Sequence, residues 1–186
     1  KVATKVSQDR IIFAGVEFMG ESAKILNPKK RVFMPDMNAD CPMAHMADKD
    51  EILALREKYD DLAVVCYINS TAELKKYSDV CVTSSNAVKI VKNLPNKNIF
   101  FIPDRNLGSY VAKQCPDKNF IFNNGCCPRH VVITKDMVLK AKELHPEARF
   151  AAHPECTEDV LAFADYVGST SGIIDYVVDT DADEYI

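Results

Sequence analysis

Two short segments place a cysteine directly before a proline, with a histidine shortly after. Cys41 lies in A-D-C-P-M-A-H and Cys127 in N-G-C-C-P-R-H, 86 positions further along the chain. A zinc knuckle would need cysteines paired at close spacing, so these two thiols do not form one. They could each give one thiolate to a shared centre, and iron–sulfur clusters are usually held by four cysteines. A third such thiolate is expected beyond Ile186. Three thiolates would leave one iron of a cluster without a protein ligand, and that iron could act as a Lewis acid.

Polar side chains capable of binding and proton transfer follow stretches that are typical of buried strands. In open parallel sheets, ligands bind outside the carboxyl ends of the strands. Hydroxyls and backbone N–H groups at a helix start also bind anions. Taken singly, a serine or threonine there is more often a helix cap, and a histidine can be a turn residue. The candidate site residues are Tyr67, Asn69, Ser84, His153, Glu155 and Thr170.

The candidate residues recur because the chain matches itself at a shift of 86 positions. Residues 67–71 then fall on 153–157, and 83–86 fall on 169–172, without a gap. Polar and thiol residues thus return at equivalent places, which favours a shared site between repeated modules. The repeat predicts that residues 1–60 form the second half of one module, 61–146 a complete module, and 147–186 the first half of a third.

The complete module alternates apolar runs with helical periodicity. This alternation predicts an α/β fold in which pseudo-repeated three-layer αβα modules, each of about 86 residues, contain parallel sheets. Hydroxyl residues at 70–71 and 84–85 are expected to start helices. The expected strands are 62–67, 79–82, 98–102 and 120–122, and the expected helices are 71–77, 84 or 85 to 92, 105–114 and 135–144.

Composition narrows the function classes. The net charge is −4 with both signs interleaved, so no basic stripe indicates a nucleic-acid partner. No apolar run reaches the roughly 20 residues of a membrane helix. The seven cysteines are an odd number at moderate density, which favours free thiols in a reducing compartment, expected to be the cytoplasm. Cys66 and Cys81 lie in apolar runs and are expected to be small core residues.

An ordered set of motifs resembles the quinolinate synthase family across essentially the whole chain. These motifs are F-M-G-E-S-A-K-I-L-N-P, A-D-C-P-M-A-H, Y-I-N-S-T-A-E, T-S-S-N-A-V, P-D-R-N-L-G, H-P-E-C and Y-V-G-S-T-S. The resemblance implies a transferase that condenses iminoaspartate with dihydroxyacetone phosphate to form quinolinate for NAD biosynthesis. It also implies three pseudo-symmetric modules around a [4Fe–4S] cluster, and an aspartate-oxidising enzyme as a possible partner that supplies iminoaspartate.

The resemblance also assigns roles to residues of this chain. Cys41 and Cys127 would be cluster ligands, with the third cysteine beyond Ile186, and Cys126 would be a bystander. Tyr67, His153 and Glu155 would be catalytic. The substrate site would contain Tyr67, Asn69, Ser84, His153, Glu155 and Thr170.

Two other interpretations stay open at this point. A cluster-dependent hydro-lyase of the aconitase type would use the same open iron without a triose phosphate. A non-catalytic αβα module would use its cysteines structurally or bind zinc. Because the family's first His-Asn-Tyr and Gly-Asp-Ser segments would precede Lys1, and a Gly-Thr-Glu segment would follow Ile186, we expect residues 1–186 alone to bind no stable cluster and to be inactive.

Overall fold

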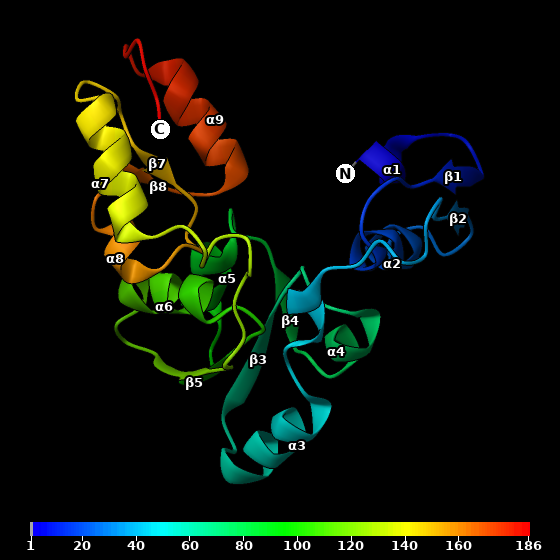
Figure 1. Cartoon of the computed structure of the whole chain (residues 1–186). Helices are drawn as coiled ribbons and strands as arrows, with labels where there is room; N and C mark the ends of the chain where they lie inside the picture. Colours follow the sequence, from blue (N-terminus) through cyan, green and yellow to red (C-terminus); the bar gives the residue numbers. More distant parts are fainter. Residues whose placement is uncertain (1) are drawn as a thin grey trace.

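The computed structural model describes residues 2–186 and alternates helices with parallel strands (Figure 1). The strands are β1 (Arg10–Ile12), β2 (Arg31–Phe33), β3 (Leu62–Tyr67), β4 (Val80–Val82), β5 (Asn98–Ile102), β6 (Asn119–Phe122), β7 (Ala151–Ala152) and β8 (Tyr166–Val167). The helices are α1 (Val2–Lys5), α2 (Glu17–Ile25), α3 (Lys49–Lys58), α4 (Ala72–Lys76), α5 (Ala87–Asn93), α6 (Arg105–Gln114), α7 (Lys135–Leu144), α8 (Glu158–Leu161) and α9 (Thr170–Asp179), with a 3₁₀ turn η1 (Pro42–His45).

The central sheet has the order β4-β3-β5-β6, and every neighbouring pair in it is parallel. Every residue of β3 is buried, because helices cover both faces of the sheet. On one face, Val91 of α5 and Leu107 of α6 pack against the strands, and on the other face Ile52 of α3 and Leu74 of α4 do so. The predicted α/β class with parallel sheets is therefore confirmed, and the central sheet lies in a three-layer arrangement.

Polar caps and one close packing contact fix the helices around this sheet. Thr71 accepts a hydrogen bond from the Leu74 N–H and so starts α4, as the sequence predicts. In α6, a Cβ placed on Gly108 would lie only 3.0 Å from the Phe101 ring. Glycine at this position lets α6 sit close to β5, which brings the start of the helix to the carboxyl end of the strand.

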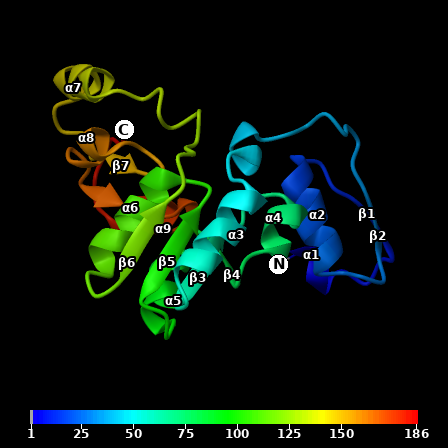
Figure 2. The same ribbon diagram turned by 90° about the horizontal axis from the view of Figure 1, so that it is seen from below.

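Two smaller parallel sheets flank the central one. The β1-β2 pair near the N-terminus and the β7-β8 pair near the C-terminus lie on opposite sides of the central sheet in both views (Figures 1 and 2). Helices α3 (49–58) and α7 (135–144) start and end at positions that differ by the shift of the predicted repeat. The pseudo-symmetry of complete modules, and their boundaries at 60 and 146, stay predictions.

Two local predictions are wrong. Helix α5 begins at Ala87 rather than at Ser84 or Ser85, because residues 83–86 form a turn in which Asn86 Oδ1 accepts a hydrogen bond from the Thr83 N–H at 2.7 Å. Cys81 is exposed rather than part of the core, because β4 is an edge strand. Cys66, on the central strand β3, is fully buried as expected.

None of the helices within residues 2–186 is both long and apolar enough to span a membrane.

Candidate active site

A cavity of about 460 Å³ collects five of the six predicted site residues. Its volume lies in the range of small-molecule sites, roughly 300–1,000 Å³. Tyr67 ends β3, Thr170 starts α9, and the remaining polar residues lie on loops after β3, β6 and β7. The lining residues are Tyr67, Asn69, His130, His153, Glu155, Thr170, Ile173 and Ile174. The roles of the five residues in binding and catalysis stay predictions.

Ser84 is the predicted residue that does not line this cavity. It lies in the turn before α5, and its interaction with the Tyr67 phenol acts to lower the pKa of that phenol. Burial and the nearby Glu155 carboxylate together raise the pKa of Tyr67 well above its ordinary value. The phenol is therefore protonated at neutral pH and can act as a hydrogen-bond donor.

Glu155 is a buried carboxylate at the centre of this group. Its side chain is 4% exposed, and its Oε2 lies 2.8 Å from His130 Nδ1 and 3.7 Å from His153 Nδ1. Burial acts to raise its pKa, but interactions with His130 and Tyr67 outweigh burial and lower the pKa below its usual value. Among the described residues, nothing hydrogen-bonds to Oε1. A buried, unpaired carboxylate oxygen at a cavity wall is suited to a bound ligand.

His130 is a residue of the site that the sequence analysis missed. Its Nδ1 lies 3.1 Å from Cys127 Sγ as well as 2.8 Å from Glu155, and its ring centroid is 5.1 Å from that of His153. The hydrogen bond to Glu155 raises the pKa of His130. Under the 86-residue shift His130 falls on Ala44, so the repeat gave no signal. The histidine that follows each Cys-Pro pair was the available hint, but His45 instead pairs with Asp40.

A buried aspartate holds Cys127 beside the His130 and Glu155 side chains. Asp104 is fully buried; its Oδ1 accepts a hydrogen bond from the Leu107 N–H at 2.7 Å, and its Oδ2 accepts one from the Cys127 N–H at 2.8 Å. One carboxylate thus caps α6 and holds the cysteine loop. Burial raises the pKa of Asp104 to about 6, although both backbone hydrogen bonds oppose the shift.

The ligand atoms of Cys127, His130 and Glu155 lie within 4.8 Å of one another, a geometry that could hold a metal ion. Burial raises the pKa of Cys127 to about 11, so metal binding would have to release its proton. Cys126 is half-buried and is not part of this group. Cys41 packs against the apolar cluster that contains Cys127, Tyr67 and Met43.

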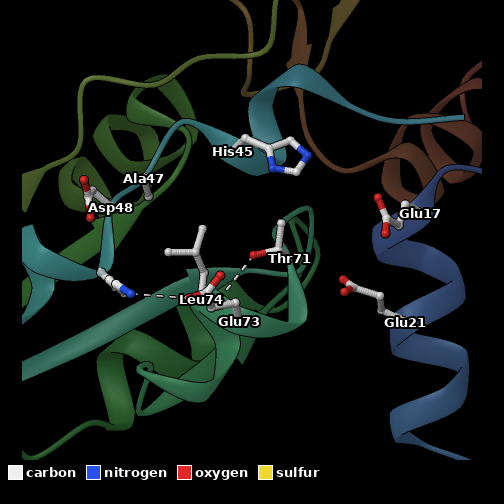
Figure 3. A pocket seen from close by; sticks show the side chains of 9 residues that line it. Glu17, Glu21, His45, Ala47, Asp48, Thr71, Glu73 and Leu74 are labelled. Carbon is white, nitrogen blue, oxygen red and sulfur yellow. Dashed lines mark hydrogen bonds and ion pairs between the residues drawn. The ribbon is translucent and has the colours of Figure 1, made fainter. Parts of the chain in front are cut away.

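A second cavity, of about 480 Å³, contains none of the predicted residues. In Figure 3, Glu17 and Glu21 extend from α2 toward the loop that carries Thr71. Glu21 Oε2 accepts a hydrogen bond from the Ala72 N–H at 2.8 Å, and Lys49 pairs with Glu73 at 3.8 Å. The charged side chains that line this second cavity thus join α2, α3 and α4, and we assign the cavity no catalytic role.

Comparison with known proteins identifies the family. The family model described as "Quinolinate synthetase A protein" matches residues 1–186. Curated proteins named quinolinate synthase match the whole chain, at 60% identity in Fusobacterium nucleatum, 53% in Caldicellulosiruptor saccharolyticus and 47% in Clostridioides difficile. The chain covers 62%, 61% and 61% of these relatives, respectively. The chain therefore belongs to the quinolinate synthetase A family.

Proposed function

We propose that the protein acts as a quinolinate synthase, condensing iminoaspartate with dihydroxyacetone phosphate to give quinolinate for NAD biosynthesis. The observation that carries this proposal is the cavity in which Glu155, with an unpaired buried oxygen, lies beside two imidazoles, a phenol and a buried thiol. Membership of the family and identity of 47–60% to curated quinolinate synthases support the same activity.

The proposed substrates and product are anions that need hydrogen-bond donors. Thr170 opens α9, and Ser169 already caps that helix by accepting from the Gly172 N–H at 3.2 Å. The Thr170 hydroxyl is therefore free of the capping role, and the positive end of the helix favours a carboxylate or phosphate beside it. The Asn69 amide lies across the same cavity, and Ser84 is placed to support Tyr67.

Condensation and loss of water need groups that take up and release protons. The Glu155 carboxylate is the proposed proton acceptor, because its free Oε1 lies at the cavity while Oε2 is held by His130. Tyr67 is the proposed donor, since its phenol stays protonated. His153 Nδ1 lies 3.4 Å from the Glu155 N–H and accepts from it, which leaves the Nε2–H of His153 able to orient the substrate.

The residues present fit the cysteine-ligated [4Fe–4S] cluster that the family implies. Cys127 presents a buried thiol beside the cavity, and Cys41 packs against the same apolar cluster. These two side chains would hold the cluster, with a third cysteine from another part of the protein. When bound, such a cluster would supply an open iron as a Lewis acid toward a substrate hydroxyl.

The test uses the protein extended to the full length of its relatives and reconstituted anaerobically with iron and sulfide. We expect iron and sulfide to fall sharply in Cys41→Ala and Cys127→Ala and to match the parent in Cys126→Ala, the matched control. With both substrates, the parent should form a product with pyridine ultraviolet absorbance. Unchanged iron in the first two variants would refute the ligand assignment. Zinc without iron and sulfide would favour the non-catalytic module, and turnover of a hydroxy acid alone would favour a hydro-lyase.

A further inference from the structure

Two cysteines outside the proposed active site face each other across neighbouring strands. Cys66 on β3 is the direct partner of Cys81 on β4 in the parallel register. Paired residues on adjacent strands point their side chains to the same face, with backbones about 4.8 Å apart. This spacing lies within the range of about 4.4–6.8 Å that a disulfide accepts between Cα atoms. Both cysteines are free thiols in the structure.

The two thiols differ in access and acidity. Cys66 is fully buried, whereas Cys81 is exposed and lines a mainly apolar cavity of about 470 Å³ between α2 and α4. Interaction with Cys66, together with the nearby Lys75 ammonium, lowers the pKa of Cys81 to about 7 although burial opposes the shift. The same interaction, with burial, raises the pKa of Cys66. The pair thus combines an accessible thiolate with a protected partner thiol, the arrangement found in redox-active cysteine pairs.

Lys75 is held in position to support this thiolate. Its Nζ donates a hydrogen bond to Ser22 Oγ at 3.0 Å and lies 5.7 Å from the centre of the Phe18 ring. These contacts come from α2, so the ammonium is fixed between α2 and α4 rather than free in solvent. Its charge interacts with both thiols.

We propose that Cys66 and Cys81 form a reversible redox site that reacts with small disulfides such as oxidised glutathione. The Cys81 thiolate attacks one sulfur of the disulfide, forming a mixed disulfide and releasing one glutathione thiolate, which takes the Cys66 proton. Cys66 then attacks the Cys81 sulfur and expels the second glutathione. Two protein thiols are oxidised to one disulfide bond, and one glutathione disulfide is reduced to two thiols.

The position of the pair gives this chemistry a structural consequence. The next register pair toward the carboxyl ends of the strands is Tyr67 with Val82, and Tyr67 lines the proposed active-site cavity. Because side chains alternate along a strand, Tyr67 points to the opposite face of the sheet from Cys66. A disulfide would therefore tie β3 to β4 directly beneath Tyr67, at the end of β3, and the turn that carries Ser84, without using any residue of the cavity.

The test uses the 186-residue chain and needs neither cluster nor substrate. The protein is equilibrated anaerobically with oxidised glutathione, its remaining thiols are alkylated under denaturing conditions, and it is digested with trypsin without reduction. Cys66 falls in fragment 59–75 and Cys81 in fragment 77–89, each with a single cysteine. We expect these two fragments to appear linked, with the loss of two of the seven thiols, and to separate after dithiothreitol.

Variants separate the two steps. In Cys66→Ser, Cys81 should retain glutathione, whereas in Cys81→Ser, Cys66 should stay a free thiol. Cys115→Ser is the matched control because Cys115, which follows the last residue of α6, is as fully buried as Cys66, and the linked fragments should persist in this variant. Three results in the parent protein would each overturn the proposal. These are glutathione left on Cys81, a disulfide that joins either cysteine to a different cysteine, and two unmodified thiols at Cys66 and Cys81.

Discussion

Replacing Asp104 by asparagine should release the Cys127 loop while leaving helix α6 capped. Asparagine has one acceptor oxygen instead of two, so it can keep the hydrogen bond from the Leu107 N–H or that from the Cys127 N–H, but not both. Asparagine and aspartate are about equally good as helix caps, so we expect the bond to α6 to be kept. The side-chain NH₂ group would then face the Cys127 N–H, leaving two donors opposed.

The size of the effect follows from the burial of the lost bond. A hydrogen bond to a charged acceptor contributes about 1.5–3 kcal/mol, and a buried donor left unpaired costs about 1–3 kcal/mol. A local loss of about 2 kcal/mol corresponds to about 30-fold in an equilibrium constant. Hydrogen exchange at the Cys127 amide should therefore accelerate about 30-fold, while exchange at the Leu107 amide should change little.

Amide exchange followed by NMR in the parent and Asp104→Asn chains provides the measurement. Asp48→Asn is the matched control, because Asp48 caps α3 from an exposed position by accepting from the Asp50 N–H. Unchanged exchange at Cys127 would refute the role of the carboxylate in holding the loop. Equal acceleration at Cys127 and Leu107 would refute the separation into two independent bonds.

Three further predictions concern packing, catalysis and pH. Gly108→Ala should lower the free energy of unfolding, measured by urea titration, by about 1 kcal/mol. Crowding of the new methyl group against buried Phe101 costs about 1–3 kcal/mol, and the higher helix propensity of alanine returns about 1 kcal/mol. A more stable variant would contradict this packing. In the protein extended to the full length of its relatives, Glu155→Gln should reduce kcat of the proposed quinolinate synthase reaction by about 100-fold or more, and an unchanged kcat would exclude Glu155 as the proton acceptor. A hydrogen bond from the Phe150 N–H lowers the pKa of Asp165 in the folded protein. The stability that this bond contributes is therefore present above the pKa of Asp165 in the unfolded chain, and it is lost as the pH falls through the pKa of Asp165 in the folded protein. Asp165→Asn should therefore cost about 1 kcal/mol at pH 7 and progressively less below about pH 4, and a loss independent of pH would contradict this assignment.

The sequence was most informative where a single local signal decides the structure. The apolar runs at 62–67 and 98–102 are β3 and β5 with the predicted bounds, because central parallel strands are buried on both faces. The start of α5 was missed because the Asn86 side chain bonds back to Thr83 and extends the turn. Hydroxyl residues in that turn look like caps in the sequence but do not cap the helix.

Features that depend on tertiary placement could not be predicted. Cys81 resembles a core residue because the sequence does not show that β4 lies at the sheet edge. His130 has no counterpart in the repeat and gains its place only when the loop after β6 meets the loop after β7 at Glu155. The bond from the Cys127 N–H to Asp104 likewise joins residues 23 positions apart, so no local pattern encodes it.

The contacts of helix α6 restrict where two members of this family can be recombined into a functional chimera. Its first turn is joined through Asp104 to Cys127, while Asn106 donates to the Glu155 carbonyl at 2.9 Å and the Tyr110 hydroxyl donates to the Val167 carbonyl at 3.4 Å. Recombination that took α6 from one parent and residues 127–167 from another would pair surfaces that had not diverged together. Functional chimeras should therefore have crossover points before β5 or after β8, with α6 and both loops inherited as one block.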